Sequence, residues 1–152
     1  MSKKIVAVSG GFDPIHVGHL RMMQDAAKYG RLTVIVNSDE WLLKKKGYVF
    51  MPWDERAELI SAYDFVDRVI KAKDDDRTVV ASLEEIRPDI FANGGDREKI
   101  NTPEARFCRE NGIEMIWGIG GGKIQSSSSM VTSVTQKKRS KDLEKYRNLN
   151  AY

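Results

Sequence analysis

Short apolar runs alternate with segments of helical spacing along most of the chain. The apolar runs predict strands at residues 4–9, 31–37, 65–70, 89–92 and 113–117. The segments between them predict helices at residues 18–29, 39–46, 52–62, 78–86 and 103–110, and a last helix that starts at residues 126–129. This alternation predicts an α/β fold: a doubly wound, mostly parallel, five-stranded Rossmann-like sheet with helices on both faces.

Residues at the ends of the predicted helices have the types that begin and end helices. Ser38 and Thr102 are expected N-caps, and Pro52 is expected in the first turn of its helix. Gly30 stands where a C-terminal cap is expected. These residues set the expected bounds of four of the helices.

Length and composition favour one globular domain. The chain has 152 residues, and hydrophobic residues make up 41% of them, enough for a sizeable core. No apolar run approaches the roughly 20 residues of a membrane span, and the start has no signal-peptide layout. The single cysteine, Cys108, excludes an internal disulfide framework and is expected to be a buried apolar residue. We therefore expect a cytoplasmic protein that does not bind membranes.

The net charge of +3 is unevenly distributed. Residues 136–152 carry six basic and two acidic groups, a local charge of +4, so residues 1–135 carry −1. We expect a domain over residues 1–135 and a basic tail over residues 136–152. The domain lacks the excess of positive charge that neutralises nucleic-acid phosphates, so we do not expect a nucleic-acid partner. The tail is expected to be a solvated helix face at a chain end.

The segment after the first strand carries the clearest chemistry. Gly10 and Gly11 let backbone N–H groups approach an anion closely. His16 and His19 are three residues apart at a helix start, so both imidazoles should project from one face near the positive end of the helix dipole. Gly18 between them leaves room for a ligand. This arrangement suits a triphosphate, because charge that develops on phosphoryl oxygens needs fixed donors.

Other kinds of site fit the same segment less well. The pattern matches neither the glycine spacing of dinucleotide sites nor that of P-loop enzymes. A zinc pair at His16 and His19 lacks an obvious third ligand, although Asp13 could be one. A lone histidine is usually structural, but both histidines of the chain lie in this loop. Phosphate contact is the favoured interpretation, and no metal-binding residue is expected.

This segment resembles the motif of the cytidylyltransferase-like nucleotidyltransferase superfamily, Gly11-Phe12-Asp13-x-x-His16-x-Gly18-His19. Asn37-Ser38-Asp39-Glu40 resembles the family's segment after the second strand. Residues 87–96 resemble its nucleotide-selecting loop, and residues 125–129 resemble its Ser/Thr helix start near the polyphosphate. The resemblance implies transfer of AMP or CMP from ATP or CTP to a phosphorylated acceptor, with release of pyrophosphate. It also implies Mg²⁺ held mainly by the nucleotide phosphates, and it is compatible with a homodimer.

The resemblance and the local chemistry together define the expected site. His16 and His19 are expected to be catalytic. The nucleotide-binding residues are expected to be Gly10, Gly11, Phe12, Asp13, Gly18, Lys44, Lys46, Asn93, Gly94, Gly95, Asp96, Lys123, Ser126, Ser127 and Ser128. Either Lys44 or Lys46 is expected to neutralise phosphate, and Arg56 is left open between structure and acceptor binding.

The loop at residues 92–97 departs from the pattern. Bacterial heptose-phosphate adenylyltransferases have Val-Lys-Gly-Gly-Asp-Tyr there, and this chain has Ala92-Asn93-Gly94-Gly95-Asp96-Arg97. The resemblance is still greatest to that sugar-phosphate group, followed by glycerol-phosphate cytidylyltransferases. A sugar or polyol phosphate is therefore the expected acceptor. The altered loop also motivates an alternative function, a non-catalytic nucleotide-binding sensor or scaffold domain.

Overall fold

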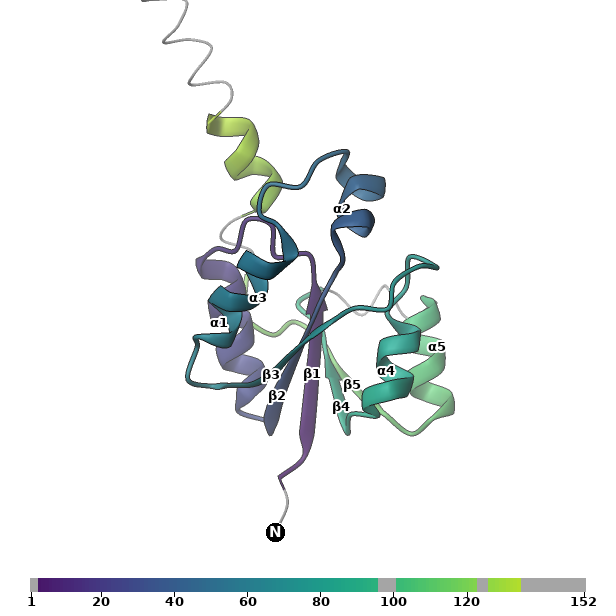
Figure 1. The fold of residues 1–152 in the computed structure, drawn as a ribbon. Helices are drawn as coiled ribbons and strands as arrows, with labels where there is room; N and C mark the ends of the chain where they lie inside the picture. The colour runs from purple at the N-terminus through teal and green to yellow at the C-terminus, as the bar shows by residue number, and fades with distance from the viewer. Residues whose placement is uncertain (1–2, 96–100, 123–125, 135–152) are drawn as a thin grey trace, which may run out of the picture.

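The predicted sheet is present in the computed structural model, which describes residues 3–95, 101–122 and 126–134. Its strands are β1 (Ile5–Gly10), β2 (Arg31–Val36), β3 (Val66–Lys71), β4 (Ile90–Ala92) and β5 (Glu114–Ile116). They form one sheet in the order β3-β2-β1-β4-β5, and every pairing is parallel (Figure 1). The doubly wound α/β prediction is confirmed. Asp96, Arg97, Lys123 and the predicted tail at residues 136–152 lie outside the described residues.

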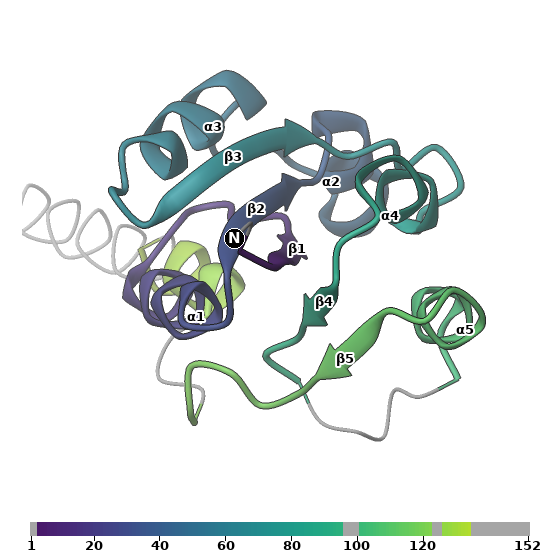
Figure 2. The same cartoon turned by 90° about the horizontal axis from the view of Figure 1, so that it is seen from below.

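Helices cover both faces of the sheet. They are α1 (Val17–Ala27), α2 (Asp39–Lys46), α3 (Trp53–Ser61), α4 (Val80–Ile86) and α5 (Pro103–Glu110), with a further helix at residues 127–134. Helices α1 and α3 lie on one face and α4 and α5 on the other, as Figure 2 shows. Helix α2 lies beyond the carboxyl ends of the strands (Figure 1).

The core has two apolar layers because the central strands are buried on both faces. On one side, Val8 and Val34 pack with Met23 of α1 and Ile60 of α3. On the other side, the apolar layer includes Ala7, Ile35, Leu83 and Cys108. Burial and the nearby Glu104 raise the pKa of the Cys108 thiol to about 11. Cys108 is thus a buried, protonated core residue, as predicted.

Two of the predicted helix starts are confirmed in detail. Ser38 accepts the backbone N–H of Trp41 at 3.1 Å. Thr102 caps α5 in the same way, because its hydroxyl accepts the N–H of Ala105 at 3.2 Å. Both helices have the predicted bounds.

Three local predictions are wrong. Pro52 is the N-cap of α3 and precedes its first turn. The C-cap of α1 is Lys28 and not Gly30. Gly30 instead lies so close to Lys4 that a Cβ at position 30 would overlap the Lys4 carbonyl. Helix α4 begins two residues later than predicted because the Asp76 carboxylate accepts the N–H and hydroxyl of Thr78 in a turn.

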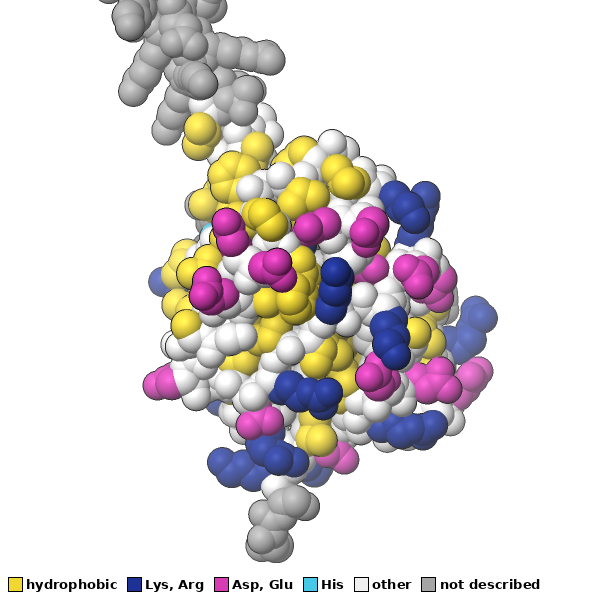
Figure 3. All heavy atoms as spheres, in the orientation of Figure 1, with side chains coloured by type: hydrophobic (Ala, Val, Ile, Leu, Met, Phe, Trp, Pro, Cys, Tyr) yellow, Lys and Arg dark blue, Asp and Glu magenta, His cyan; other side chains and the backbone are white. Residues whose placement is uncertain are grey.

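The described surface mixes both signs of charge. On the face shown in Figure 3, basic and acidic side chains are interspersed and do not separate into patches of one sign. Within the described part of the chain, the structure has no helix that is both long enough and apolar enough to span a bilayer.

Candidate active site

A cavity of about 480 Å³ lies at the carboxyl ends of the strands, where the strand order reverses between β1 and β4. It is lined by the loops after β1, β4 and β5, by one face of α1, by part of α2 and by residues 126–128. The sequence-predicted residues that line it are Gly11, Phe12, Gly18, Lys46, Gly94, Gly95, Ser126, Ser127, Ser128 and both histidines. The cavity therefore brings together five separate segments of the sequence, residues 11–22, 41–46, 94–95, 119–122 and 126–128.

Four of the other predicted residues do not line this cavity. A Cβ on Gly10 would lie 2.9 Å from the Phe12 ring, so that position serves packing. Lys44 is exposed on α2. The side-chain amide of Asn93 donates to the carbonyls of Phe91 and Ile116 and thus ties β4 to β5. Asp13, the fourth, has a structural role of its own.

Asp13 anchors the loop between α2 and α3. Its buried carboxylate accepts the backbone N–H of Phe50 at 2.7 Å and that of Met51 at 2.5 Å. The Lys46 ammonium donates to the Asp13 backbone carbonyl at 3.3 Å. An ionised carboxylate that accepts two backbone N–H groups is a strong anchor. Asp13 therefore fixes the position of the loop next to Lys46.

The two histidines lock each other at the start of α1. His16 is the N-cap, and its Nδ1 accepts the N–H of Gly18 at 3.0 Å. The Nδ1 of His19 accepts the backbone N–H of His16 at 3.2 Å. The rings stack with centroids 3.7 Å apart. Because each Nδ1 is an acceptor, a neutral ring carries its proton on Nε2, the nitrogen that can donate to an anion.

The surroundings of His19 keep its ring uncharged. Burial, and then the charges of His16 and Lys46, lower the pKa of His19 to about 3. The ring of Phe12 packs against it edge-on with centroids 4.9 Å apart. His19 is therefore a neutral donor at pH 7, held in place by its neighbours.

Positive charge dominates the described lining. Lys45 and Lys46 both line the cavity, and the Lys45 ammonium lies 4.6 Å from the centre of the Trp41 ring. Burial lowers the pKa of Lys46, as do Lys45 and Arg56, whereas Asp13 acts in the opposite direction. No described lining residue is acidic. Such a cavity favours anions.

Arg56 has a structural role, which settles the question left open by the sequence. Its side chain is 0% exposed, and its guanidinium donates to three backbone carbonyls and to the carboxylate of Asp39 at 2.6 Å. The carbonyls belong to Gly11, Asn37 and Met51. Arg56 therefore joins the loop after β1 to the end of β2 and the start of α2.

Asp74 is a second buried anchor, and sequence analysis missed it. Its carboxylate accepts from the Asn37 amide at 3.1 Å and from the N–H and hydroxyl of Ser38 at 2.9 and 2.7 Å. The Ser38 hydroxyl in turn caps α2. Asp74 thereby sets the direction in which α2 leaves the sheet. No local motif marks this residue, because its partners are about 36 residues away in the sequence.

The serine run begins the helix at residues 127–134. The Ser126 hydroxyl accepts the N–H of Ser129 at 3.4 Å, and the Ser127 hydroxyl donates to the Pro14 carbonyl at 2.7 Å. The second contact ties this helix start to the loop after β1. Serine hydroxyls and helix-start N–H groups thus lie on the same cavity as the histidines.

Several lining residues were not among the predicted ligands. They are Met22, Trp41, Lys45, Ile119, Gly120, Gly121 and Gly122. Lys45 lies between Lys44 and Lys46, the two lysines that the sequence offers as phosphate ligands. Among the described residues, no group of three His, Cys, Asp or Glu side chains is arranged to hold a metal ion. The zinc alternative therefore has no third ligand in this part of the chain.

A parallel sheet of this order, with an anion-favouring cavity where the order reverses, defines a doubly wound α/β protein with its site at the carboxyl ends of the strands. Within that class, the chain belongs to the cytidylyltransferase-like family, whose model matches residues 7–117. This confirms the family resemblance.

Comparison with known proteins agrees with this assignment. The chain is 33% identical over 148 residues to the bifunctional protein HldE of Geotalea uraniireducens, covering 95% of this chain and 27% of that protein. It is 36% identical over 95 residues to the FAD synthase of Ferroglobus placidus, covering 62% of this chain and 60% of that enzyme. A lipopolysaccharide core biosynthesis protein from Thermoplasma volcanium has a similar structure, with a TM-score of 0.64 and 25% identity over 79% of this chain and 98% of that chain. The chain thus spans only part of these curated relatives.

Proposed function

We propose that this protein is a nucleotidyltransferase that transfers AMP or CMP from ATP or CTP to a small phosphorylated acceptor, a sugar or polyol phosphate. The observation that carries the proposal is the locked histidine pair: two Nε2 donors at the start of α1, on an anion-favouring cavity. The curated relatives include an FAD synthase and several bifunctional HldE proteins, and the name of the first is that of an enzyme that makes a nucleotide cofactor.

The proposed reaction needs positioning and charge neutralisation. An oxygen of the acceptor phosphate attacks the α-phosphorus of the nucleotide in line, the bond to the β-phosphate breaks, and pyrophosphate leaves. An ionised phosphate is already a nucleophile at pH 7, so the site needs no general base. The Nε2–H groups of His16 and His19 would donate to the phosphoryl oxygens on which charge develops. The ammonium of Lys46 would neutralise further charge.

The remaining lining residues would hold the substrate phosphates. Backbone N–H groups at Gly11 and Phe12 would face phosphate oxygens, and Ser126–Ser128 would bind the β- and γ-phosphates at a helix start. Mg²⁺ suits such a site because it prefers oxygen ligands and keeps several waters. With no acidic side chain in the described lining, phosphate oxygens and water would be its ligands, and it would neutralise phosphate charge.

Pyrophosphate release tests this proposal directly. The protein is incubated with ATP or CTP, Mg²⁺ and a panel of sugar and polyol phosphates, and pyrophosphate is measured. We expect release that depends on both one nucleotide and one acceptor. Nucleotide binding without pyrophosphate release across a broad panel would favour the alternative of a non-catalytic sensor. The same panel distinguishes ATP from CTP.

A further inference from the structure

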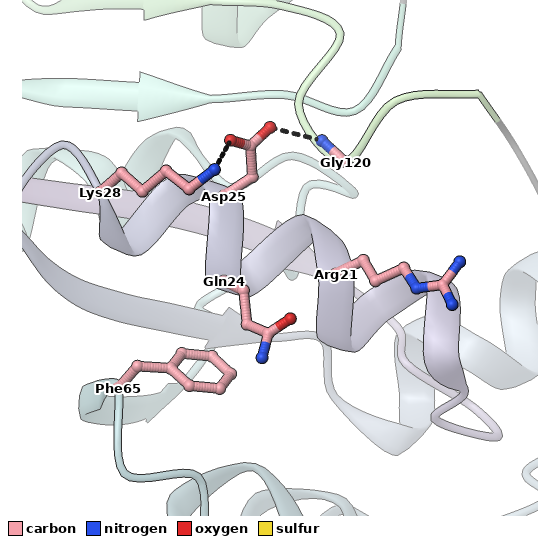
Figure 4. A pocket seen from close by; sticks show the side chains of 6 residues that line it. All are labelled: Arg21, Gln24, Asp25, Lys28, Phe65 and Gly120. Atoms are coloured by element: carbon pink, nitrogen blue, oxygen red, sulfur yellow. Dashed lines mark hydrogen bonds and ion pairs between the residues drawn. The ribbon is translucent and has the colours of Figure 1, made fainter.

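Gly120, in the glycine-rich loop after β5 (residues 118–122), lies between two hollows. One is the cavity described above. The other is a more open hollow of about 600 Å³ on the outer side of α1, lined by Arg21, Gln24, Asp25, Lys28, Phe65 and Gly120 (Figure 4). Gly120 lines both hollows. The position of this loop therefore sets the width of the cavity on that side.

The loop is fastened on two sides. Its own backbone joins it to the loop after β4, because Gly118 donates to the Gly95 carbonyl at 3.1 Å and Ile119 donates to the Asn93 carbonyl at 3.2 Å. On the other side, the Gly120 N–H donates to the Asp25 carboxylate of α1 at 2.8 Å (Figure 4). Asp25 and Gly120 are 95 residues apart in the sequence. This contact is called the Asp25 latch below.

The Asp25 latch lies where Gly120 approaches α1 closely, beside Met22. Gly120 has a φ of +83°, and a Cβ there would lie 2.9 Å from the Met22 Cα. Met22 lines the cavity and lies one helical turn beyond His19 on the same face of α1. The loop that Asp25 positions is therefore about one turn away from the histidine pair.

We propose that Asp25 is a positioning residue for nucleotide binding. It touches no substrate, but it keeps the Gly120 loop closed on α1, so that the cavity beside Met22 keeps the width that fits a nucleotide. This inference rests on the proposed function. We expect Asp25 to affect the affinity for the nucleotide and not the rate of the chemical step, because the Gly120 loop lies next to the histidine pair and contributes no group to it.

The chain offers a matched set of variants. Asp25→Ala removes the acceptor and breaks the latch. Asp25→Asn keeps a side-chain oxygen that can accept from Gly120 but loses the charge. Lys28→Ala removes only the ion pair on the outer side of α1, where the ammonium lies 3.4 Å from Asp25 and is exposed. The set thus separates the latch from the charge and from the ion pair.

Two measurements on the full chain test the proposal. Hydrogen exchange of the amides at residues 118–122, without nucleotide, should become faster in Asp25→Ala and remain slow in Asp25→Asn and Lys28→Ala. The Kd for ATP or CTP should rise about tenfold in Asp25→Ala, the factor that corresponds to about 1.4 kcal/mol. The increase should appear in the nucleotide KM with little change in kcat, and Asp25→Asn should restore most of the affinity.

The outcomes distinguish this proposal from the proposed function. If exchange in the loop is the same in Asp25→Ala and the unmodified chain, no latch exists. If exchange becomes faster but the Kd is unchanged, Asp25 only stabilises the fold, and its positioning role is overturned. If the unmodified chain binds neither ATP nor CTP, the proposed function fails, and the role of Asp25 in nucleotide binding fails with it, whatever the exchange shows.

Discussion

His16 and His19 hold each other in one arrangement: the backbone N–H of His16 donates to Nδ1 of His19 at 3.2 Å, and the two rings stack. The same two residues thus cap the helix and are proposed to donate to the substrate phosphates. The ring nitrogen that accepts a backbone N–H at the helix start is Nδ1, so a neutral ring carries its proton on Nε2. A substitution at either position therefore affects both the start of α1 and the proposed active site.

Replacing His19 should abolish most of the activity. We expect His19→Ala to lower the rate of pyrophosphate release by at least about 100-fold, because it removes a fixed donor to charge that develops in the transition state. The loss of the cap should cost only about 1 kcal/mol, so the variant should still fold. Circular dichroism checks the fold, and Gln24→Ala, an exposed change on the same helix, is the control. Wild-type turnover in folded His19→Ala would remove the proposed role.

The low pKa of His19 makes stability depend on pH. The folded pKa is about 3, against 6.5 for an unperturbed histidine. Between these values the unfolded chain binds a proton that the folded chain does not, so the stabilising contribution is complete above pH 6.5 and is lost as the pH falls. His19 should make the free energy of unfolding fall by at most about 1.4 kcal/mol per pH unit between pH 6.5 and 4.5, and we expect His19→Gln to remove this dependence.

Urea unfolding at several pH values, on the wild-type protein and on His19→Gln, measures this slope. The free energy of unfolding of the wild-type protein should fall steadily relative to that of His19→Gln from pH 6.5 to pH 4.5. Parallel curves over that range would show that His19 titrates normally in the folded protein.

Lys46 and Lys44 should behave differently although they are two residues apart. Lys46 lines the cavity, and Lys44 is exposed on α2. We expect Lys46→Ala to weaken binding of inorganic triphosphate about tenfold at low salt, and less at high salt, since an ion pair is screened. Lys44→Ala is the matched control and should change affinity little. Calorimetric titration measures both, and equal effects would mean that the lysine run acts only through its total charge.

Arg56 should matter for stability more than any exposed arginine. Arg56→Met keeps much of the volume but leaves the carbonyls of Gly11, Asn37 and Met51, which are buried or partly buried, without this donor. Each unpaired buried group costs about 1–3 kcal/mol, so we expect a loss of at least about 3 kcal/mol in the free energy of unfolding. Arg68→Met, an exposed change on β3, is the control. A loss below about 1 kcal/mol in Arg56→Met would contradict the structural role.

The order of strands and helices could be predicted because it depends on local patterns. Helices α2 and α5 begin and end where Ser38, Thr102 and the apolar spacing predict. Helix α4 was placed two residues too early because the Asp76 carboxylate forms a turn that the pattern of apolar positions does not reveal.

The site was predicted less completely, because neighbouring residues of one type look alike in a sequence. The lysine run contains three candidates, and only the direction of α2 decides which of them reach the cavity. That direction depends on Asp74 and Arg56. Their partners in the loop after β1, at the end of β2 and at the start of α2 lie 17 to 45 residues away along the chain. The motif predicts Asp13 as a ligand, whereas in the structure its carboxylate accepts the backbone N–H groups of Phe50 and Met51.

By itself the sequence determined the alternation of strands and helices, the placing of two histidines and Gly18 at a helix start, and the resemblance to a family. These features depend on residues within a few positions of each other, where backbone preference and apolar spacing decide the outcome. Only the tertiary structure decided that Lys46 and not Lys44 lines the cavity, that Asp13 and Arg56 are anchors, and that Asp25 holds Gly120. Those relationships join residues far apart in the chain, so packing of the whole sheet and its helices decides them.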